Sequence, residues 1–234
     1  MKRIIKISLI LLLVGMAVIA AVPFFKEKRA ERKYENEFKK IQENVTEKKS
    51  DVNGLVKKNK DCIGYVEIPG TTISYPVMQT KDNPDFYLNH DFNRNYSFYG
   101  TPYLSAYCDV NKSDNLIIYG HNINGGKMFG ALEQYKDKEF FNKHRKIYFA
   151  TDKKREYEVF AVMSVNIHEF EYWKFVMARD AKEYDEFVDK VEEHSLWRQG
   201  NKPKYGEQML MLSTCDNGKG DDWRIVLIAK CVYS

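Results

Sequence analysis

The fold is decided by residues 208–232, QMLMLSTCDNGKGDDWRIVLIAKCV. Two apolar runs, QMLML and RIVLIAKCV, flank a polar turn that carries two glycines. Runs of this kind are typical of buried strands, and a glycine-bearing turn between them predicts an antiparallel pair. The pairing would bring Arg224, which opens the second run, close to Cys215, nine residues before it.

Similar strand-like runs recur upstream. They are IGYVEIPGTTISYPVMQ (63–79, broken at Pro69-Gly70 and Pro76), LIIY (116–119), KIYFA (146–150) and YEVFAVMSV (157–165). Residues 181–199 differ, because their apolar side chains recur at mostly helical spacing ahead of a glycine and a proline. Six or more strands and one long helix predict a mainly β fold with helical insertions, either a barrel or a sandwich.

Composition limits the class of protein. The 234 residues are 44% hydrophobic and include 16 Tyr and 14 Phe, which is ample material for a packed core and excludes wholesale disorder. The four cysteines form no C-x-x-C pair, so we expect neither a zinc ribbon nor a disulfide-built scaffold. No histidine has a second histidine four residues away in the sequence, the spacing that would let both bind one metal ion from the same face of a helix. We therefore expect no metal site and no cofactor.

The net charge of +4 belongs to the N-terminus. Residues 1–33 carry eight basic and two acidic side chains, which leaves 29 basic and 31 acidic side chains in residues 34–234. Because residues 34–234 are slightly acidic, they lack the positive electrostatic potential that attracts the phosphates of a nucleic acid. We therefore expect no nucleic-acid partner.

The first 60 residues differ from the rest in composition. Residues 7–25 run for 19 residues without a charge, which is long enough to cross a hydrocarbon core of roughly 30 Å. We predict a short cytoplasmic tail over 1–6, a transmembrane anchor over 7–25, a helical juxtamembrane region over 26–60 and the main folded domain over 61–234. Within 26–60, one apolar stripe is formed by Tyr34, Phe38, Ile41 and Val45.

The orientation of the anchor does not follow from the flanking charges. Three basic residues precede the apolar segment and five follow it closely, which on its own opposes export. Long domains cross the membrane largely regardless of such charges. We therefore expect an uncleaved single-pass anchor with an extracellular body, and a cleaved signal peptide ending near Ala20 is the alternative.

Two strand-like runs end in side chains that can carry chemistry. LIIY leads into Gly120-His121-Asn122, and QMLML leads into Ser213-Thr214-Cys215. A cysteine and a histidine suffice for thiol nucleophilic catalysis, because the thiolate attacks and the histidine exchanges protons with it and with the leaving amine. Arg224 could supply a fixed cation for an oxyanion. Alternatively, Cys215 is a packing residue and Arg224 pairs with Asp221 or Asp222 at the surface.

These segments together resemble the class B sortases of Gram-positive bacteria. The resemblance rests on Leu212-Ser213-Thr214-Cys215, the arginine nine positions later, Gly120-His121-Asn122 and GYVEIPGTTISYPVMQ, and it spans about residues 61–232. The family's Thr-Leu-x-Thr-Cys signature has Met211 in place of its first threonine. Residues 181–199 and the helical N-terminal extension resemble the insertions that distinguish class B from class A.

The resemblance implies an eight-stranded barrel and a membrane-anchored cysteine transpeptidase. In that family's scheme Cys215 is the nucleophile, His121 the general acid and base, and Arg224 the cation that orients the substrate and stabilises the oxyanion. Ser213 and Thr214 would contact the substrate. The implied partners are secreted proteins with an Asn-Pro-x-Thr-type sorting signal and a peptidoglycan amine acceptor.

Three other functions stay open at this point. A pilin-polymerising sortase or a hydrolytic cysteine protease would use the same three residues. A non-catalytic, membrane-tethered binding protein with an inert Cys215 belongs to a different functional class.

Overall fold

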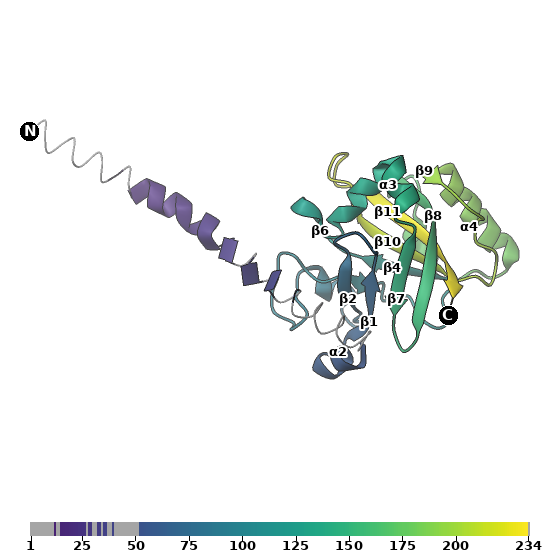
Figure 1. Ribbon diagram of the computed structural model, residues 1–234, viewed down its shortest axis with the longest axis horizontal. Coiled ribbons are helices and arrows are strands. Elements are labelled where there is room, and N and C mark those ends of the chain that lie inside the picture. Colours follow the sequence, from purple (N-terminus) through teal and green to yellow (C-terminus); the bar gives the residue numbers. More distant parts are fainter. Residues whose placement is uncertain are drawn as a thin grey trace, which may run out of the picture. The chain divides into compact units, whose positions relative to one another are not determined.

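The computed structural model describes residues 12, 15–26, 28, 29, 32, 33, 35, 36, 39 and 52–233 (Figure 1). The chain divides into two compact units, Met1–Glu47 and Lys48–Ser234. In the first unit, the described residues are helical. No helix formed by the described residues combines the length and the apolar character needed to cross a bilayer. The predicted anchor over 7–25 lies partly outside these residues, and the predicted stripe from Tyr34 to Val45 lies wholly outside them.

The second unit is built on one sheet that closes on itself. Its strands follow the order β11-β10-β4-β3-β2-β1-β7-β8, and β11 pairs with β8 to complete an eight-stranded barrel, as the sequence resemblance implied (Figure 1). The strands are β1 (Cys62–Glu67), β2 (Ser74–Met78), β3 (Tyr103–Leu104), β4 (Asn115–Tyr119), β7 (Lys146–Ala150), β8 (Lys154–Asn166), β10 (Met209–Cys215) and β11 (Trp223–Tyr233). A further hairpin joins β5 (Asn122–Ile123) to β6 (Lys127–Met128).

The barrel is closed by its two longest strands. The 13 residues of β8 and the 11 residues of β11 pair in antiparallel fashion from Trp223 opposite Asn166 to Tyr233 opposite Glu156. Most of their apolar side chains are almost fully withdrawn from water, as are most of those of β10 and β4, although Val232 near the end of β11 is 48% exposed. Closure leaves these strands without a free edge, so the backbone groups at the centre of the fold are paired.

The helix α4 (Ala181–Glu193) covers one side of the barrel near β8 and β9 (Ser195–Arg198) (Figure 1). It begins at Asp180, whose side chain accepts a hydrogen bond from the Glu183 N–H. Its buried face is formed by Tyr184, Phe187, Val188 and Val191, which recur at the spacing of one helical stripe. The predicted insertion is therefore helical, but it is shorter than the sequence suggested.

The predicted helix over 181–199 is wrong in its last turn. The helix stops at His194, and Ser195–Arg198 form the strand β9, which pairs with β8. The backbone of residues 195–198 forms hydrogen bonds with the edge of β8. The helical spacing of Leu196 in the sequence gives no sign of this pairing. This is a case in which tertiary pairing overrides a weak helical pattern.

Shorter elements complete the unit. They are α2 (Val52–Lys58), α3 (Lys138–Lys143), and the 3₁₀ turns η1 (Phe86–Leu88), η2 (Asn124–Gly126), η3 (Gly130–Lys136) and η4 (Tyr172–Lys174). The helix α2 buries Val52 and Leu55 and contacts β1. The turns η1 and η3 matter most for function: η1 reaches the segment after β4, and η3 reaches the segments after both β4 and β10, through the hydrogen bonds described below.

Candidate active site

Two strand pairings bring Cys215, His121 and Arg224 to one edge of the barrel. The parallel pair of β10 and β4 sets Ser213 opposite Tyr119, so Cys215 and His121 each lie two residues beyond matched positions. The antiparallel pair of β10 and β11 sets Cys215 directly opposite Arg224. Side chains at opposed positions share one face of a sheet, with Cβ atoms about 5 Å apart. The antiparallel pair predicted from the sequence is therefore present, and it places Arg224 close to Cys215 as expected.

Side chains continue the link between β4 and β10 where the regular ladder ends. The Gly120 N–H donates to the Ser213 carbonyl at 3.2 Å, and the Thr214 hydroxyl donates to the Gly120 carbonyl at 2.7 Å. One residue further, the Asn122 amide donates to the Cys215 carbonyl at 2.8 Å. The chain on either side of His121 is therefore fastened to the chain that carries Cys215.

The thiol of Cys215 is free and partly exposed. By contrast, Cys62 and Cys108 are buried, and burial raises the pKa of Cys62 to about 12 and that of Cys108 to about 11. A buried thiol with a raised pKa is a poor nucleophile at neutral pH, because the thiolate is the attacking species. Of these three thiols, only Cys215 is placed to react with a large substrate.

The ring of His121 is oriented by the turn η1. Its Nε2 atom lies 2.7 Å from the carbonyl oxygen of Leu88. A carbonyl oxygen only accepts hydrogen bonds, so Nε2 carries a proton in this arrangement. The remaining nitrogen, Nδ1, is left to exchange a proton with another group, which is the property a general acid and base needs.

The guanidinium of Arg224 is held by main-chain oxygens. Its Nη1 donates to the carbonyls of Asp221 at 2.5 Å and Trp223 at 2.9 Å. Within residues 52–233, neither the Asp221 nor the Asp222 carboxylate forms an ion pair with Arg224, so the surface-pair alternative is not what this structure contains. One side of the planar group is anchored, and its Nε and Nη2 hydrogens have no acceptor among those same residues.

Three tyrosines, Tyr103, Tyr119 and Tyr172, lie near Cys215 or Arg224. Burial raises the pKa of Tyr172 to about 12, even though a hydrogen bond to Ser213 and the charge of Arg224 favour its ionised form. The pKa values of Tyr103 and Tyr119 are raised as well, chiefly by burial. The hydroxyl of Tyr103 donates to Asp85 at 3.1 Å. Tyr103 and Tyr172 are buried and their hydroxyls already have partners, so these neutral phenols belong to the packed surroundings of the site, and of the three tyrosines only Tyr119 is partly exposed.

Ser213 and Thr214, the predicted substrate contacts, are both buried. Ser213 is 2% exposed and its hydroxyl lies 2.7 Å from that of Tyr172. Thr214 is 3% exposed and bonds to the Gly120 carbonyl. Both side chains are buried, on opposite faces of β10, and already have partners, so their placement favours fixing Tyr172 and the His121 segment over touching a substrate. Strand periodicity alone could not reveal this, because both faces of β10 are covered.

Asp216, in the polar stretch between the two apolar runs, has a position in the interior that its sequence context does not reveal. The side chain is fully buried, and it accepts hydrogen bonds from Lys136 and Ser164, both at 2.6 Å. Burial alone would raise the pKa of Asp216, but these two hydrogen bonds and the Lys136 charge lower it below its usual value. The residue that follows Cys215 is thus an ionised carboxylate in a closed pocket of polar groups.

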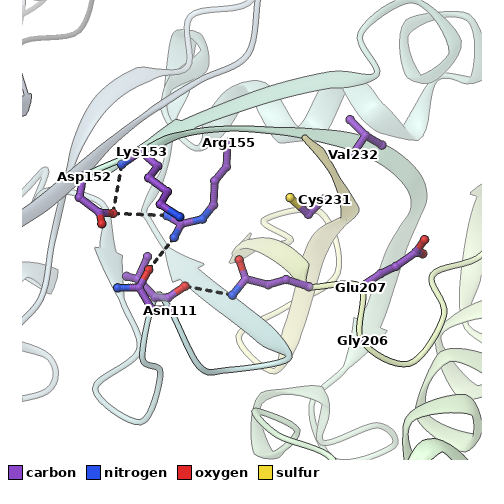
Figure 2. Close-up of a pocket in the computed structure, with 10 residues that line it drawn as sticks. Asn111, Asp152, Lys153, Arg155, Gly206, Glu207, Cys231 and Val232 are labelled. Atoms are coloured by element: carbon purple, nitrogen blue, oxygen red, sulfur yellow. Dashed lines mark hydrogen bonds and ion pairs between the residues drawn. The ribbon is translucent and has the colours of Figure 1, made fainter. Parts of the chain in front are cut away.

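A surface cavity of about 660 Å³ lies at the other end of the barrel (Figure 2). It is lined by residues that precede β10 and residues at the end of β11, including Gln208 and Cys231. A strand of seven residues places these about 20 Å from Cys215. Figure 2 shows Arg155 directed at Asn111, which accepts its hydrogen bond at 2.6 Å. The guanidinium is partnered within the protein, and this cavity is separate from the Cys215 site.

Comparisons with known proteins agree with this geometry. A sortase-domain family model matches residues 66–232. The chain is 30% identical to sortase B of Staphylococcus aureus (strain NCTC 8325 / PS 47) over 245 residues, 99% of this chain and 98% of that protein. It is similar to a solved Staphylococcus aureus sortase B–substrate complex, with a TM-score of 0.74 at 27% identity over 88% of this chain and 97% of that one.

It is also similar to a solved sortase B complexed with triglycine, with a TM-score of 0.76 at 29% identity over 88% of this chain and 98% of that one. The extent of these matches covers the whole barrel, and it includes the segments that carry Cys215, His121 and Arg224. The chain therefore belongs to the sortase family, within its class B, and is a cysteine transpeptidase.

Proposed function

We propose that this sortase cleaves an Asn-Pro-x-Thr-type sorting signal in secreted proteins and joins the new carboxyl end to an amino group of peptidoglycan. The observation that carries the proposal is the pair of strand registers that set His121 and Arg224 beside the partly exposed thiol of Cys215. The anchored guanidinium of Arg224 supports a peptide as the substrate, because its remaining hydrogens can bind a carbonyl group.

The reaction has two half-steps. The Cys215 thiolate attacks the carbonyl carbon of the threonine in the signal, and Arg224 stabilises the oxyanion that forms. The C–N bond breaks, His121 gives a proton to the departing amine, and an acyl-thioester remains on Cys215. An acceptor amine then attacks the thioester carbon, His121 takes the proton of that amine, and Cys215 leaves as the thiolate.

The first half-step is tested by mass spectrometry of the intact protein. Incubation of residues 26–234 with peptides that contain Asn-Pro-x-Thr, with x varied, should add the mass of the acyl fragment. Cys215→Ala should abolish this adduct, because no other group at the site can form the thioester. An adduct of equal yield on Cys215→Ala would end the assignment of Cys215 as the nucleophile.

The second half-step separates transfer from hydrolysis. A similar sortase B has been solved in complex with triglycine, which supports a peptide amine as the acceptor for this chain. Adding triglycine to the preformed acyl-enzyme should speed loss of the adduct and yield the ligated peptide. Release of the free acid at a rate that triglycine leaves unchanged would favour a hydrolytic protease over a transpeptidase.

We propose that the apolar segment over 7–25 anchors the enzyme in the cell membrane with residues 34–234 outside. The support is the uncharged run of 19 residues and the extracellular location of a peptidoglycan acceptor. Protease added to intact cells stripped of their wall should digest the body of the protein. Protection that is lost only on lysis would contradict this orientation and, with it, the wall acceptor.

A further inference from the structure

A closed ring of side chains lies behind the proposed nucleophile. Lys136, at the end of η3, places Nζ 2.6 Å from Asp216 Oδ1 and 2.7 Å from Glu133 Oε2. The other oxygen of Glu133, Oε1, accepts a hydrogen bond of 2.7 Å from the Asn122 amide. The same amide nitrogen donates its second hydrogen to the Cys215 carbonyl at 2.8 Å. Because Asp216 follows Cys215 in the chain, the ring is complete.

The ring joins the two segments that carry the proposed reacting pair. Asn122 follows His121, and Asp216 follows Cys215, so each end of the ring is one residue from a group that must meet the other. Successive residues of an extended chain point to opposite sides, which turns the Asp216 carboxylate away from the thiol. It therefore acts from behind Cys215 and does not contact the substrate.

The donors and acceptors of the ring match one another. Asn122 donates two hydrogens, Lys136 donates two, and the carboxylates of Glu133 and Asp216 only accept. The second oxygen of Asp216 is occupied by the Ser164 hydroxyl at 2.6 Å. A buried charge pair of this kind contributes little net stability compared with apolar packing, and its best-attested use is to specify one arrangement.

The turn η3 that presents the ring is itself fixed. The indole N–H of Trp197, in β9, donates to the Lys136 carbonyl at 2.9 Å. The Lys136 side chain is one-third exposed, while its partner Asp216 is fully covered. The strand that sequence analysis mistook for the last turn of a helix thus supports the residue that pairs with Asp216.

We propose that Asn122, Glu133, Lys136 and Asp216 are positioning residues, which as one unit hold the Cys215 main chain in register with His121 for acylation. The inference rests on Cys215 and His121 as the reacting pair. Under this proposal η3, which carries none of Cys215, His121 and Arg224, affects the rate of acylation by positioning the residues that react. A displacement of about 1 Å between reacting groups is enough to cost on the order of 100-fold in rate.

The test uses single-turnover acylation by an Asn-Pro-x-Thr peptide on three variants: Asn122→Ala, Lys136→Met and the double variant. Each single variant should lower the rate at saturating peptide by roughly 10- to 100-fold, with KM changed less than about twofold. Because both break the same ring, the double variant should be about as slow as the slower single variant. Alkylation of Cys215 by iodoacetamide should stay near the wild-type rate, since the thiol remains exposed.

Lys146→Met is the matched control, because Lys146 forms an exposed pair with Glu156 on β7 and β8. It should leave acylation unchanged. If Lys136→Met fails to fold, Asn122→Ala, which alters no charge, decides the question. Wild-type acylation by folded Asn122→Ala, rate losses that multiply in the double variant, or a parallel loss of alkylation would each overturn the proposal. Failure of the nucleophile assignment is distinct, because it would appear as acylation of Cys215→Ala.

Discussion

At the scale of single residues, Arg224 is held so that the planar shape of its guanidinium, and not its positive charge alone, matters for binding a substrate. One nitrogen is committed to the Asp221 and Trp223 carbonyls, which leaves the rest of the planar group to bind a peptide oxygen. A lysine keeps the positive charge, but its single ammonium cannot hold the main-chain carbonyls and a substrate oxygen in one plane. The chemistry that depends on Arg224 is therefore sensitive to a change that conserves charge.

Arg224→Lys should lower the acylation rate by about 100-fold or more while the thermal midpoint stays within a few degrees. Single-turnover acylation and a thermal melt would be measured together. Arg179→Lys is the control, because Arg179 forms an exposed pair with Glu183 on the side of α4. An acylation rate for Arg224→Lys equal to that of Arg179→Lys would remove Arg224 from the site.

Residue patterns identified Cys215, His121 and Arg224 but not Asp216. The first three stand at the ends of apolar runs, which is a local signal that strand periodicity detects. The partner that gives Asp216 its role, Lys136, lies 80 residues earlier in the chain. A short polar turn gives no sign of such a distant pairing, and Asp216 in DNGKGDD therefore resembles an ordinary turn residue.

At the scale of elements, the segment that contains η1 controls the histidine through the main chain. The Leu88 carbonyl that orients His121 lies against Gly100, where an added Cβ would stand 2.4 Å from that oxygen. Gly100 also has a φ of +59°, which disfavours other residues. The close approach at this glycine therefore sets the position of the acceptor for Nε2.

Gly100→Ala should slow acylation by roughly 10-fold or more, because relief of the clash must move the Leu88 carbonyl away from His121. Saturating acylation rates and denaturant midpoints would be compared. The control is Gly206→Ala, since Gly206 also has a positive φ, +91°, but nothing lies within 4 Å of its added Cβ. Both variants should lose stability from backbone strain, and Gly100→Ala should lose more because its Cβ also clashes with main-chain oxygens. Equal acylation rates would show that the Leu88 carbonyl does not matter.

Elements were predictable where the local pattern was strong. The runs at 146–150 and 224–232 correspond to β7 and nearly all of β11, because long apolar stretches bounded by turns have few alternatives. The two residues of β3 carry no periodicity. The parallel pairing of β4 with β10, which brings His121 to Cys215, joins segments more than 90 residues apart. The sequence did not predict that pairing; the resemblance to sortases implied only that His121 and Cys215 act together.

At the scale of the whole molecule, burial of ionisable groups makes the barrel sensitive to alkali. Burial raises the pKa of Tyr65 and Tyr172 to about 12. The same cause raises the pKa of further tyrosines among the described residues, namely Tyr75, Tyr87, Tyr103, Tyr119, Tyr135, Tyr157 and Tyr184. The buried thiols Cys62 and Cys108 behave alike. All these groups release their protons more easily from the unfolded chain.

The sign of the pH effect follows from proton counts. Above about pH 9 for thiols and pH 10 for tyrosines, the unfolded chain binds fewer protons than the folded one, so stability falls as pH rises. Each group contributes about 1.4 kcal/mol per pH unit between its unfolded and folded pKa values. The urea midpoint should be steady near pH 8 and fall steeply by about pH 10.5. A midpoint unchanged to about pH 11 would contradict this account.

Tyr135→Phe tests the cause of that fall. The Tyr135 hydroxyl is buried and donates to the His144 carbonyl at 2.7 Å, so its removal should cost about 1 kcal/mol near pH 8. The variant has one fewer buried group that must keep its proton. Its deficit in unfolding free energy relative to wild type should therefore shrink as pH rises past about 10. The measurement is a urea titration of the variant and of wild type, each near pH 8 and again above about pH 10. If the variant's deficit in unfolding free energy stays constant between the two, tyrosine ionisation does not drive the alkaline loss of stability.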